Sequence, residues 1–512
     1  MTTTDESIRR APGDAAGPGR RRWGMLAVLL AGQFMALLDV TIVNVALPTI
    51  GRTLHASGAE LQLVVSGYTV CYAMLLITGA RLGDLRGRRL LFLVGVAVFT
   101  LASAVCGLAP STGVLIAARF VQGAGAATTI PQIMSVIQAR FAGADRARAL
   151  SAYSAVLASG FVAGQVAGGL LVNADLFGSE WRPVFLVNVP IGLVVLALAP
   201  RLIPRDSPGA GRRRIDLAGL AIAVPAVFLI VLPLTLGHQE HWPWWVPACA
   251  GAGLVLAAAF VVVERRVAAR GGDPLLNVRV LRTPGLISGL AVMILLMASY
   301  GGFLFALALQ LQGGLGESAL RAGLTFAPSA LVFGLVGFYW NRLPVRVHHL
   351  LTPVGCTVAV AMYVLLGLDL ASGTRGGALL QVILVLLGGS LAAGFSPLVT
   401  HSLMRVPVTA AADASGLLTT TVQLGQAVGV AVFGSVFLSL AVHPLAAVHP
   451  LAAVHPLAGA SAVAHSLAGA SGHALAVTLF WVAGVLGAGA LASIPLTVTV
   501  RRARIAPQSP RS

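Results

Sequence analysis

Long apolar runs alternate with short polar connections along almost the whole chain. A run of about 20 apolar residues is long enough to cross the hydrocarbon core of a bilayer as a helix. Boundaries at Arg, Pro, Gly and Asp divide the chain into fourteen such runs. We expect transmembrane helices at about residues 24–47, 61–80, 90–109, 112–136, 149–172, 184–203, 216–236, 244–263, 285–309, 322–340, 350–369, 377–403, 415–441 and 475–498.

The length of these runs and their pattern of polar and apolar residues indicate the kind of secondary structure. Lipid gives the backbone no hydrogen-bond partners, so only α-helices and closed β-barrels span a membrane. Barrel strands alternate lipid-facing and inward-facing residues over about 10 positions, whereas the apolar runs here are longer and lack that alternation. The pattern therefore predicts an all-α integral membrane protein with fourteen transmembrane helices.

The composition excludes an ordinary soluble protein. Of the 512 residues, 57% are hydrophobic and only 10% are charged, and the mean hydropathy is +0.89. Soluble domains carry about 25% charged residues, so a soluble enzyme of this length would have too few charges to cover its surface. The four cysteines lie inside or at the ends of apolar runs, which favours packing rather than disulfide bonds.

The charges define a topology. All 34 basic residues are arginines, and the formal net charge is +17. A basic balance can indicate nucleic acid or an anionic lipid surface, but these arginines form short clusters between the apolar runs. In the fourteen-helix register the clusters fall on one side, as the positive-inside rule requires, so we expect cytoplasmic termini and no nucleic-acid partner. The arginines expected outside are Arg52, Arg182, Arg321 and Arg375.

Three segments lie outside the predicted helices at the ends of the chain and before the last helix. Residues 1–22 and 499–512 are expected to be cytoplasmic tails, the first of them disordered, because the first apolar run is too long for a signal peptide. Residues 442–473 are expected to form an external loop, in which A-V-H-P-L-A occurs three times at 441–458.

The histidines of this repeat loop allow two interpretations. They could form a metal site or a pH sensor. We favour a tandem duplication in an unconstrained loop, because the sixfold spacing supplies no carboxylate or thiol partners, and we expect no metal site. The histidines concerned are His443, His449, His455, His465 and His473.

Two charged residues, Asp39 and Arg119, fall deep inside predicted helices. A charge at that depth costs at least about 2.5 to 3.5 kcal/mol, so such residues usually face the bundle interior and mark a functional path. Both are expected roughly 10 to 12 Å below the outer face, counting about 1.5 Å per residue, so they can pair directly or through water. We favour a carboxylate that exchanges its proton over a purely structural ion pair between the two helices.

Small residues form the next pattern. In T-G-A-R-L-G-D-L-R-G-R-R at 78–89, glycines allow close helix approach and a tight turn, and the acid can accept from a helix N-terminus or from an arginine. In R-F-V-Q-G-A-G-A-A at 119–127 and G-F-V-A-G-Q-V-A-G-G at 160–169, small residues let helix backbones pack closely. The residues expected to pack helices are Gly123, Gly160, Gly164, Gly168 and Gly169.

Taken together, these motifs resemble the major facilitator superfamily, and more narrowly its fourteen-helix drug:proton antiporter branch. The most specific stretch is L-D-V-T-I-V-N-V-A-L-P at 38–48, which places the acid in the first helix. The 79–89 loop and R-F-V-Q-G-A-G at 119–125 follow in the family's order, with W-R-P-V-F-L-V-N-V-P-I-G at 181–192 and the stretch 414–431 further along. The resemblance spans nearly the whole chain.

The resemblance implies two six-helix bundles, at 23–203 and 285–498, which rock around a central cavity, with two inserted helices in the linker 204–284. It also implies a proton-coupling role for Asp39 with Arg119 as its partner. One departure concerns the antiporter signature, which has Gly-Pro where this chain has Gly164-Gln165, so we expect the polar amide to line the cavity instead. The proton-coupling and substrate residues are then Asp39, Arg119, Gln122, Asn44, Gln33 and Gln165, and the conformational latch is Gly79, Gly83, Asp84, Gly87 and Arg88.

These features lead to a functional hypothesis: an exporter in the bacterial inner membrane that expels hydrophobic or amphipathic small molecules, such as antibiotics, in exchange for protons. We expect it to act as a monomer in the lipid bilayer, without a cofactor, driven by the proton gradient. The alternative is a specific exporter of an endogenous metabolite or lipid-like product. An intramembrane lipid-modifying enzyme is disfavoured, because the chain has no paired Asp motif, H-E-x-x-H or Gly-rich phosphate loop.

The duplication hypothesis for the repeat loop has a direct test. Deletion of residues 443–458 should leave transport intact, because an unconstrained loop contributes neither to packing nor to the pathway. Transport activity of the deletion variant in membranes, normalised to the amount of inserted protein, measures this. Loss of activity in correctly inserted protein would support the metal or pH-sensor interpretation instead.

Overall fold

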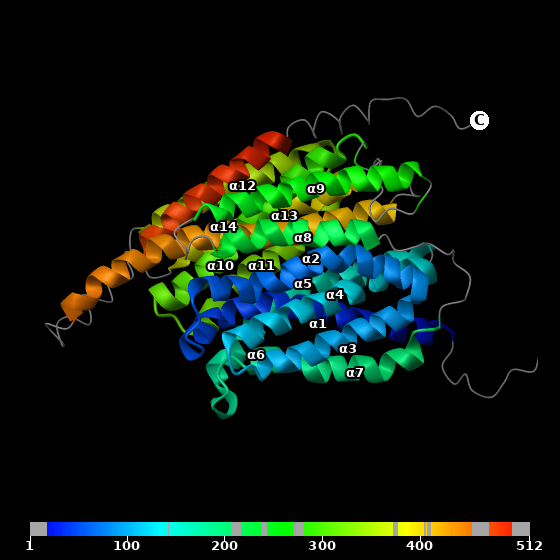
Figure 1. The fold of residues 1–512 in the computed structure, drawn as a ribbon, viewed down its shortest axis with the longest axis horizontal. Helices are drawn as coiled ribbons and strands as arrows, with labels where there is room; N and C mark the ends of the chain where they lie inside the picture. Colours follow the sequence, from blue (N-terminus) through cyan, green and yellow to red (C-terminus); the bar gives the residue numbers. More distant parts are fainter. Residues whose placement is uncertain are drawn as a thin grey trace, which may run out of the picture.

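Long helices that run side by side make up the structure, a computed structural model (Figure 1). The described residues contain helices, turns and bends but no β-strand, so the all-α prediction is confirmed for this part of the chain. The described residues are 18–141, 143–205, 217–236, 243–270, 272, 281, 283–371, 377–403, 406, 411–452 and 471–493.

The first half of the chain forms one bundle. One apolar cluster of this bundle surrounds Met35, Phe92 and Phe99, and a second surrounds Ile42 and Trp181. The expected helix at 184–203 is interrupted at Val187, between α6 and α7. The helices of this half are α1 (Pro18–Thr53), α2 (Gly58–Arg86), α3 (Arg88–Gly107), α4 (Thr112–Arg140), α5 (Gly143–Ala174), the short η1 (Leu176–Gly178), α6 (Pro183–Leu186) and α7 (Asn188–Leu202).

The second half forms another bundle around its own apolar cluster, which includes Phe303, Tyr363 and Leu387. A short π-helix, η3 (Gln310–Gly314), extends α10. The remaining elements of this half are α10 (Leu286–Leu309), α11 (Ala319–Tyr339), η4 (Trp340–Arg342), η5 (Val345–Val347), α12 (His348–Ala371), α13 (Ala378–Leu403), α14 (Ala411–Ala452) and a last helix at 471–493.

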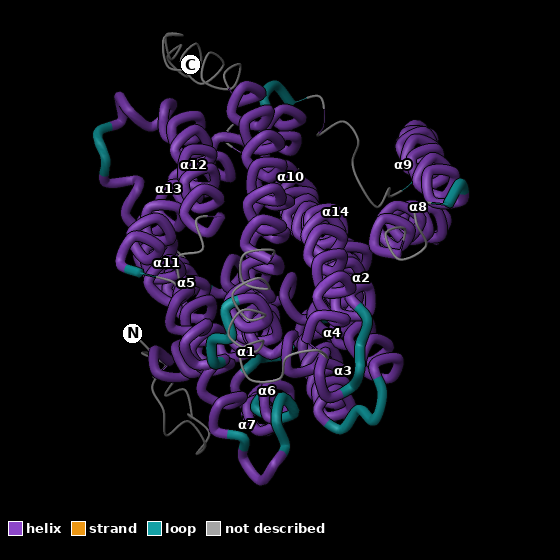
Figure 2. Tube along the Cα trace, turned by 90° about the vertical axis from the view of Figure 1, so that its left-hand side faces the viewer, coloured by secondary structure: helices purple, strands orange, loops and turns teal. Residues whose placement is uncertain are grey.

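Two further helices, α8 (Leu217–Leu236) and α9 (Trp245–Ala269), lie between the halves in the sequence. In space they lie at one side of the molecule (Figure 2), where α8 packs against α2 and α14, and α9 packs mainly against α8. Large apolar side chains of α9, such as Leu254 and Val255, are exposed. That exposure fits a helix that faces lipid rather than water.

Twelve of the described helical segments are long and apolar enough to cross a membrane. The expected number was fourteen, and the two remaining segments belong to α5 and α8. Their described apolar stretches are only Val162–Ala174 and Ala221–Ile230, and the first turns of α5 carry charged residues, among them Asp145 and Arg148. The multi-pass helical architecture is confirmed, whereas the count of fourteen is not.

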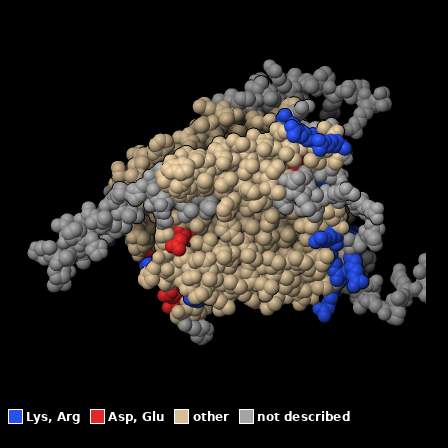
Figure 3. Space-filling view, in the orientation of Figure 1, with Lys and Arg blue, Asp and Glu red and all other residues tan. Residues whose placement is uncertain are grey.

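Charged residues separate between the two ends of the bundle. On the face shown in Figure 3, most of the visible arginines gather at one end and most of the visible acidic atoms lie at the opposite end. We call the first the arginine end; it is where α1 begins and where α2, α4, α7 and α9 end. Arginines at these positions are Arg22, Arg86, Arg140, Arg201 and Arg266.

The two bundles meet mainly through α5 with α11 and α2 with α14. Near the end opposite the arginines, the Gln62 amide bonds with the Ser435 hydroxyl at 3.4 Å, and Gln312 of η3 donates to the Val45 carbonyl at 2.8 Å. Phe305 of α10 belongs to the same buried cluster as residues of the first half. The halves are therefore in direct contact at this end.

Glycines allow several of these close approaches. A Cβ at Gly160, Gly164 or Gly168 of α5 would come within 3.0 Å of an atom of α1. One at Gly123 would meet the Tyr68 carbonyl of α2, and one at Gly169 would meet the Ala319 carbonyl of α11, across the two halves. The residues expected to pack helices all lie at such contacts.

Some expectations concern segments at the edge of the described part. The predicted helix end at residue 441 differs from the structure, in which α14 continues to Ala452 through two of the three A-V-H-P-L-A repeats. The expectations for residues 1–17, 453–470 and 494–512 lie outside the described residues.

The contact between α5 and α1 predicts a sensitive position. Gly164→Ala should lower stability by about 1 to 3 kcal/mol, the usual cost of an overpacked contact, because the new methyl group would collide with the Thr41 hydroxyl and the Leu38 carbonyl. The matched control is Gly113→Ala in α4, where a Cβ meets nothing within 4 Å. Thermal unfolding of both variants in detergent measures the effect, and equal stability of the two would contradict it.

Candidate functional site

A buried ion pair joins α1 and α4 inside the first half. The Arg119 guanidinium donates through Nη1 to Asp39 Oδ2 at 2.5 Å, and both side chains are at most 1% exposed. Residues of α1 and α4 on either side are apolar or small, so neither charge has access to water. The structure thus brings the two deep charges of the sequence into direct contact.

Two amides complete the surroundings of the carboxylate. Gln122, one turn after Arg119 on α4, donates through Nε2 to Asp39 Oδ1 at 2.8 Å. Asn188, the first residue of α7, donates to the same oxygen at 3.0 Å and to the Ser103 hydroxyl at 3.1 Å. Both amide residues are fully buried. Three donors from two helices therefore converge on one carboxylate, which suits its ionised form.

Arg119 has partners of its own besides the carboxylate. Its Nε donates to the Val64 carbonyl of α2 at 2.9 Å, and its Nη1 donates to Gln122 Oε1 at 2.8 Å. The guanidinium also lies 4.6 Å from the ring centroid of Tyr68 and 5.7 Å from that of Phe185. Cation–π contacts of this kind stabilise a desolvated positive charge. The cation would therefore keep several partners if it lost Asp39.

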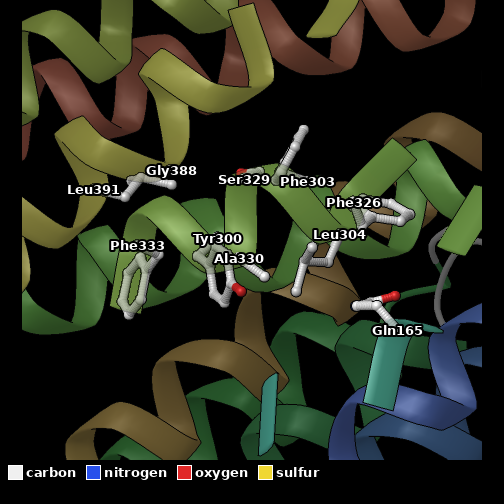
Figure 4. A pocket seen from close by; sticks show the side chains of 10 residues that line it. All are labelled: Gln165, Tyr300, Phe303, Leu304, Phe326, Ser329, Ala330, Phe333, Gly388 and Leu391. Carbon is white, nitrogen blue, oxygen red and sulfur yellow. The ribbon is translucent and has the colours of Figure 1, made fainter. Parts of the chain in front are cut away.

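A second polar group lies apart from this pair. Gln165 of α5 is 3% exposed, and its Oε1 has no hydrogen-bond partner among the described residues. It lines a small pocket whose other residues come from α10, α11 and α13 of the second half (Figure 4). The pocket residues of most interest are Gln165, Tyr300, Phe303, Phe326, Ser329 and Phe333.

The six residues expected to form one coupling and substrate site therefore separate. Asp39, Arg119 and Gln122 lie together, whereas Gln165 faces the second half. Asn44 donates instead to the Val40 carbonyl, one turn back on α1. Gln33 is buried, and its Oε1 has no partner in the part of the chain that is described. The sequence could not show this separation, because it depends on the direction in which each side chain points.

The expected latch residues lie where α2 turns into α3. Gly87, with a φ of 102°, forms this turn, which favours glycine because other residues rarely adopt a positive φ. A Cβ at Gly79 or Gly83 would collide with α4, and Gln132 of α4 donates to the Gly79 carbonyl at 2.8 Å. Arg88 donates to the Ser135 carbonyl of α4 at 3.2 Å. These contacts tie the turn to α4.

The side chain of Asp84, the acid of the expected latch, lies outside the described residues. The contacts of the latch therefore come from its glycines and from Arg88, all directed at α4.

Sequence reasoning missed several residues of the site. Asn188 entered the sequence analysis only within the 181–192 motif, although a polar residue between Val187 and Val189 inside an apolar run was a usable signal. Ser103, which supports Asn188 and itself donates to the Phe185 carbonyl at 2.8 Å, looks like an ordinary small residue in the sequence. Tyr68 and Phe185 gave no signal, because aromatic residues in membrane helices mostly pack.

One further acidic residue, Glu264, is more deeply buried in the structure than its position in the sequence indicated. Glu264 was expected just beyond a helix that ends at 263, but α9 continues to Ala269 and Glu264 is fully buried. It lies near the arginine end, on a helix that packs mainly against α8. Among the described residues no group of three or more His, Cys, Asp or Glu side chains could hold a metal ion.

Comparisons with known proteins give a consistent result. The family model described as "Major Facilitator Superfamily" matches residues 29–430. The chain is 38% identical to a protein of Streptomyces coelicolor named "Probable actinorhodin transporter", over 84% of this chain and 75% of that one. It is 39% identical to the cephamycin export protein of Amycolatopsis lactamdurans, over 80% of this chain and 84% of that one.

The fold is also known from solved structures. A bacterial homologue of the human lysosomal transporter Spinster, solved in an inward-facing, unoccupied conformation, superposes with a TM-score of 0.69 at 19% identity. The match covers 96% of this chain and all of that one. At this identity the likeness describes the fold alone.

The buried ion pair predicts that the stability of the protein depends strongly on the balance of charge at this site. Arg119→Gln should destabilise the protein by about 3 to 5 kcal/mol, because it leaves the Asp39 carboxylate buried without its countercharge. The double variant Asp39→Asn, Arg119→Gln should recover much of this loss, since no charge then remains to be compensated. The yield and thermal stability of purified protein measure both. An Arg119→Gln variant as stable as the parent would contradict the argument.

Proposed function

The chain belongs to the Major Facilitator Superfamily, and we propose that it is a proton-coupled exporter of hydrophobic or amphipathic small molecules, including antibiotics. The names of its relatives, an actinorhodin transporter and a cephamycin export protein, support the substrate class. The single observation that carries the coupling is the fully buried Asp39 carboxylate, held by a cation and two amides inside a membrane bundle.

Asp39 is suited to exchange a proton because its two charge states are both accommodated. Ionised, it accepts from Arg119, Gln122 and Asn188. Burial disfavours this charge, whereas the neighbouring cation favours it, so a modest change in the surroundings can alter the balance. Protonated, the carboxyl becomes a donor and a weaker acceptor at one oxygen, so its contact with the partner of that oxygen weakens and can be released.

The partners of Arg119 make that release feasible. When Asp39 is neutral, the guanidinium keeps the Val64 carbonyl, Gln122 Oε1 and the two ring faces. It is therefore not stranded when the pair opens. Because these partners belong to α2, α4 and α6, protonation of a residue on α1 changes how α1 is held against its neighbours. We propose this as the step that couples the proton to the rocking of the halves.

The contacts between the halves indicate which conformational state of the transport cycle the structure has. The pairs Gln62 with Ser435 and Gln312 with Val45 hold the halves together near the end opposite the arginines. With the arginine end in the cytoplasm, as the positive-inside rule favours, this is a state closed toward the outside. The turn containing Gly83, Asp84 and Arg88 would act as the latch of the opposite state, as the family resemblance implies.

We also propose that α5 and α8 cross the membrane, which gives fourteen spans. With fourteen, the start of α1 and the end of the last helix lie on the same side, and the arginine clusters at the helix ends all face the cytoplasm. α5 packs along α1 and α11, and α8 packs against α2 and α14, so both run beside helices that do span.

Export of one endogenous metabolite remains the second candidate. The relatives that carry the names of single antibiotics favour it as much as broad drug efflux. The family assignment is consistent with a transporter rather than an enzyme. Resistance and transport assays with a panel of compounds in a pump-deficient host distinguish export of one metabolite from export of many drugs.

The coupling role of Asp39 predicts a clear loss of function. Asp39→Asn should insert and fold but lose drug-dependent proton release. The release should fall to the background of empty vesicles, because an amide does not exchange a proton at the pH of the assay. Inverted membrane vesicles with an acidic interior, monitored with a pH-sensitive dye while cephamycin and, separately, lipophilic antibiotics are added, measure this.

A matched control is Asp145→Asn, which removes the 43%-exposed acid that pairs with Arg148 at 3.5 Å near the start of α5. This variant should release protons like the parent. Full drug-dependent release by Asp39→Asn, in protein inserted to the same level, would remove Asp39 from the coupling role.

A further inference from the structure

The pocket beside Gln165 has an aromatic wall on the side of the second half. The rings of Tyr300 on α10 and Phe333 on α11 lie 6.1 Å apart, centroid to centroid, with only 17° between their planes. Phe395 of α13, which is not among the residues that line the pocket, packs with its ring centroid 6.2 Å from that of Phe333. Figure 4 shows the Tyr300 and Phe333 rings next to each other along the pocket. Such faces bind other flat rings by offset stacking.

The opposite side of the pocket offers one polar atom. Gln165 Oε1 is buried and has no hydrogen-bond partner among the described residues, although an unpaired buried acceptor is costly. The amide comes from α5, whose backbone touches α11 at this point, since a Cβ at Gly323 would lie 2.4 Å from the Gln165 carbonyl. This contact holds the amide at the edge of the pocket.

The two sides of the pocket belong to different halves of the molecule. Gln165 is part of the first half, and the aromatic wall is part of the second. If the halves rock, the distance between amide and wall changes. A ligand that needs both would therefore bind one state better than the other, which is the requirement for a ligand to influence the transition.

We propose that this pocket binds a flat aromatic ring bearing an O–H or N–H donor, with the ring against Tyr300 and Phe333 and the donor on Gln165 Oε1. This inference rests on the proposed export function and assigns the ligand class of its substrate pathway. In this state the pocket has room for about one water molecule, so the ring, as one end of a larger molecule, enters when the two halves move apart. The donor satisfies the amide oxygen that the protein leaves unpaired, and this selects hydroxylated or aminated rings over their etherified analogues.

The test uses two probes that differ only in the donor: hydroxymethyl-anthraquinone and its methyl ether. Equilibrium dialysis against the purified full-length protein in lipid nanodiscs, without a pH gradient, gives the affinity for each. The parent should prefer the alcohol by about five- to tenfold, the contribution of one hydrogen bond at a buried site. Gln165→Met should abolish this preference and leave the affinity for the ether within about twofold.

Phe333→Leu should weaken both probes by about fivefold, because it removes part of the stacking surface but not the acceptor. Two control variants should behave like the parent. Gln381→Met removes another amide whose Oε1 has no partner, on α13 outside the pocket, and Phe338→Leu removes a 38%-exposed ring on the same helix as Phe333. Retained ether binding serves as the folding check for Gln165→Met.

The outcomes separate this inference from the proposed function. A Gln165→Met variant that keeps the preference for the alcohol, or a parent that shows no preference or binds neither probe, overturns the pocket assignment. Drug-dependent proton release by the parent would still stand in each of these cases. Conversely, Asp39→Asn should keep the preference for the alcohol, because the ion pair and the pocket share no residue.

Discussion

The burial of one positive and one negative charge inside a membrane bundle is the constraint on which the first half depends. The Asp39 carboxylate could not stay charged there without Arg119, because lipid and apolar side chains give a charge no solvation. Their contact therefore fixes how α1 faces α4. The remaining partners, the Val64 carbonyl, Gln122 and Asn188, extend the same constraint to α2 and α7. Most helices of this half are thus tied to one ion pair.

The two halves use different chemistry. The first half encloses a hydrogen-bonded charge, whereas the second presents rings such as Tyr300 and Phe333 to the pocket. A transporter of lipophilic molecules benefits from this separation. A charged group in the binding pocket would cost desolvation with every apolar ligand, while an acid enclosed in one half can change its proton without contacting the ligand. Because α5 and α11 touch at Gly323, the half that holds the ion pair stays in contact with the half that holds the aromatic rings.

Particular residues show how far sequence reasoning reached. The apolar runs predicted helices close to their observed bounds, since about 20 apolar residues in lipid leave the backbone one option. Arg119 and Asp39 were identifiable because charge inside an apolar run is rare. Ser103 and Glu264 were not, because their burial follows from helix rotation and helix length. The count of fourteen spans rested on α5 and α8, whose described apolar stretches are short.

The sequence by itself determined the membrane class, the helical architecture and the family motifs, because hydropathy over a whole helix is a local property of the chain. Only the tertiary structure decided that the polar residues of α1, α4 and α5 belong to two separate places rather than one. Each helix has many possible rotations about its axis, and the packing of glycines such as Gly164 and Gly123 against neighbouring backbones selects one of them. That rotation turns Asp39 toward Arg119 within the first half and Gln165 toward the aromatic rings of the second.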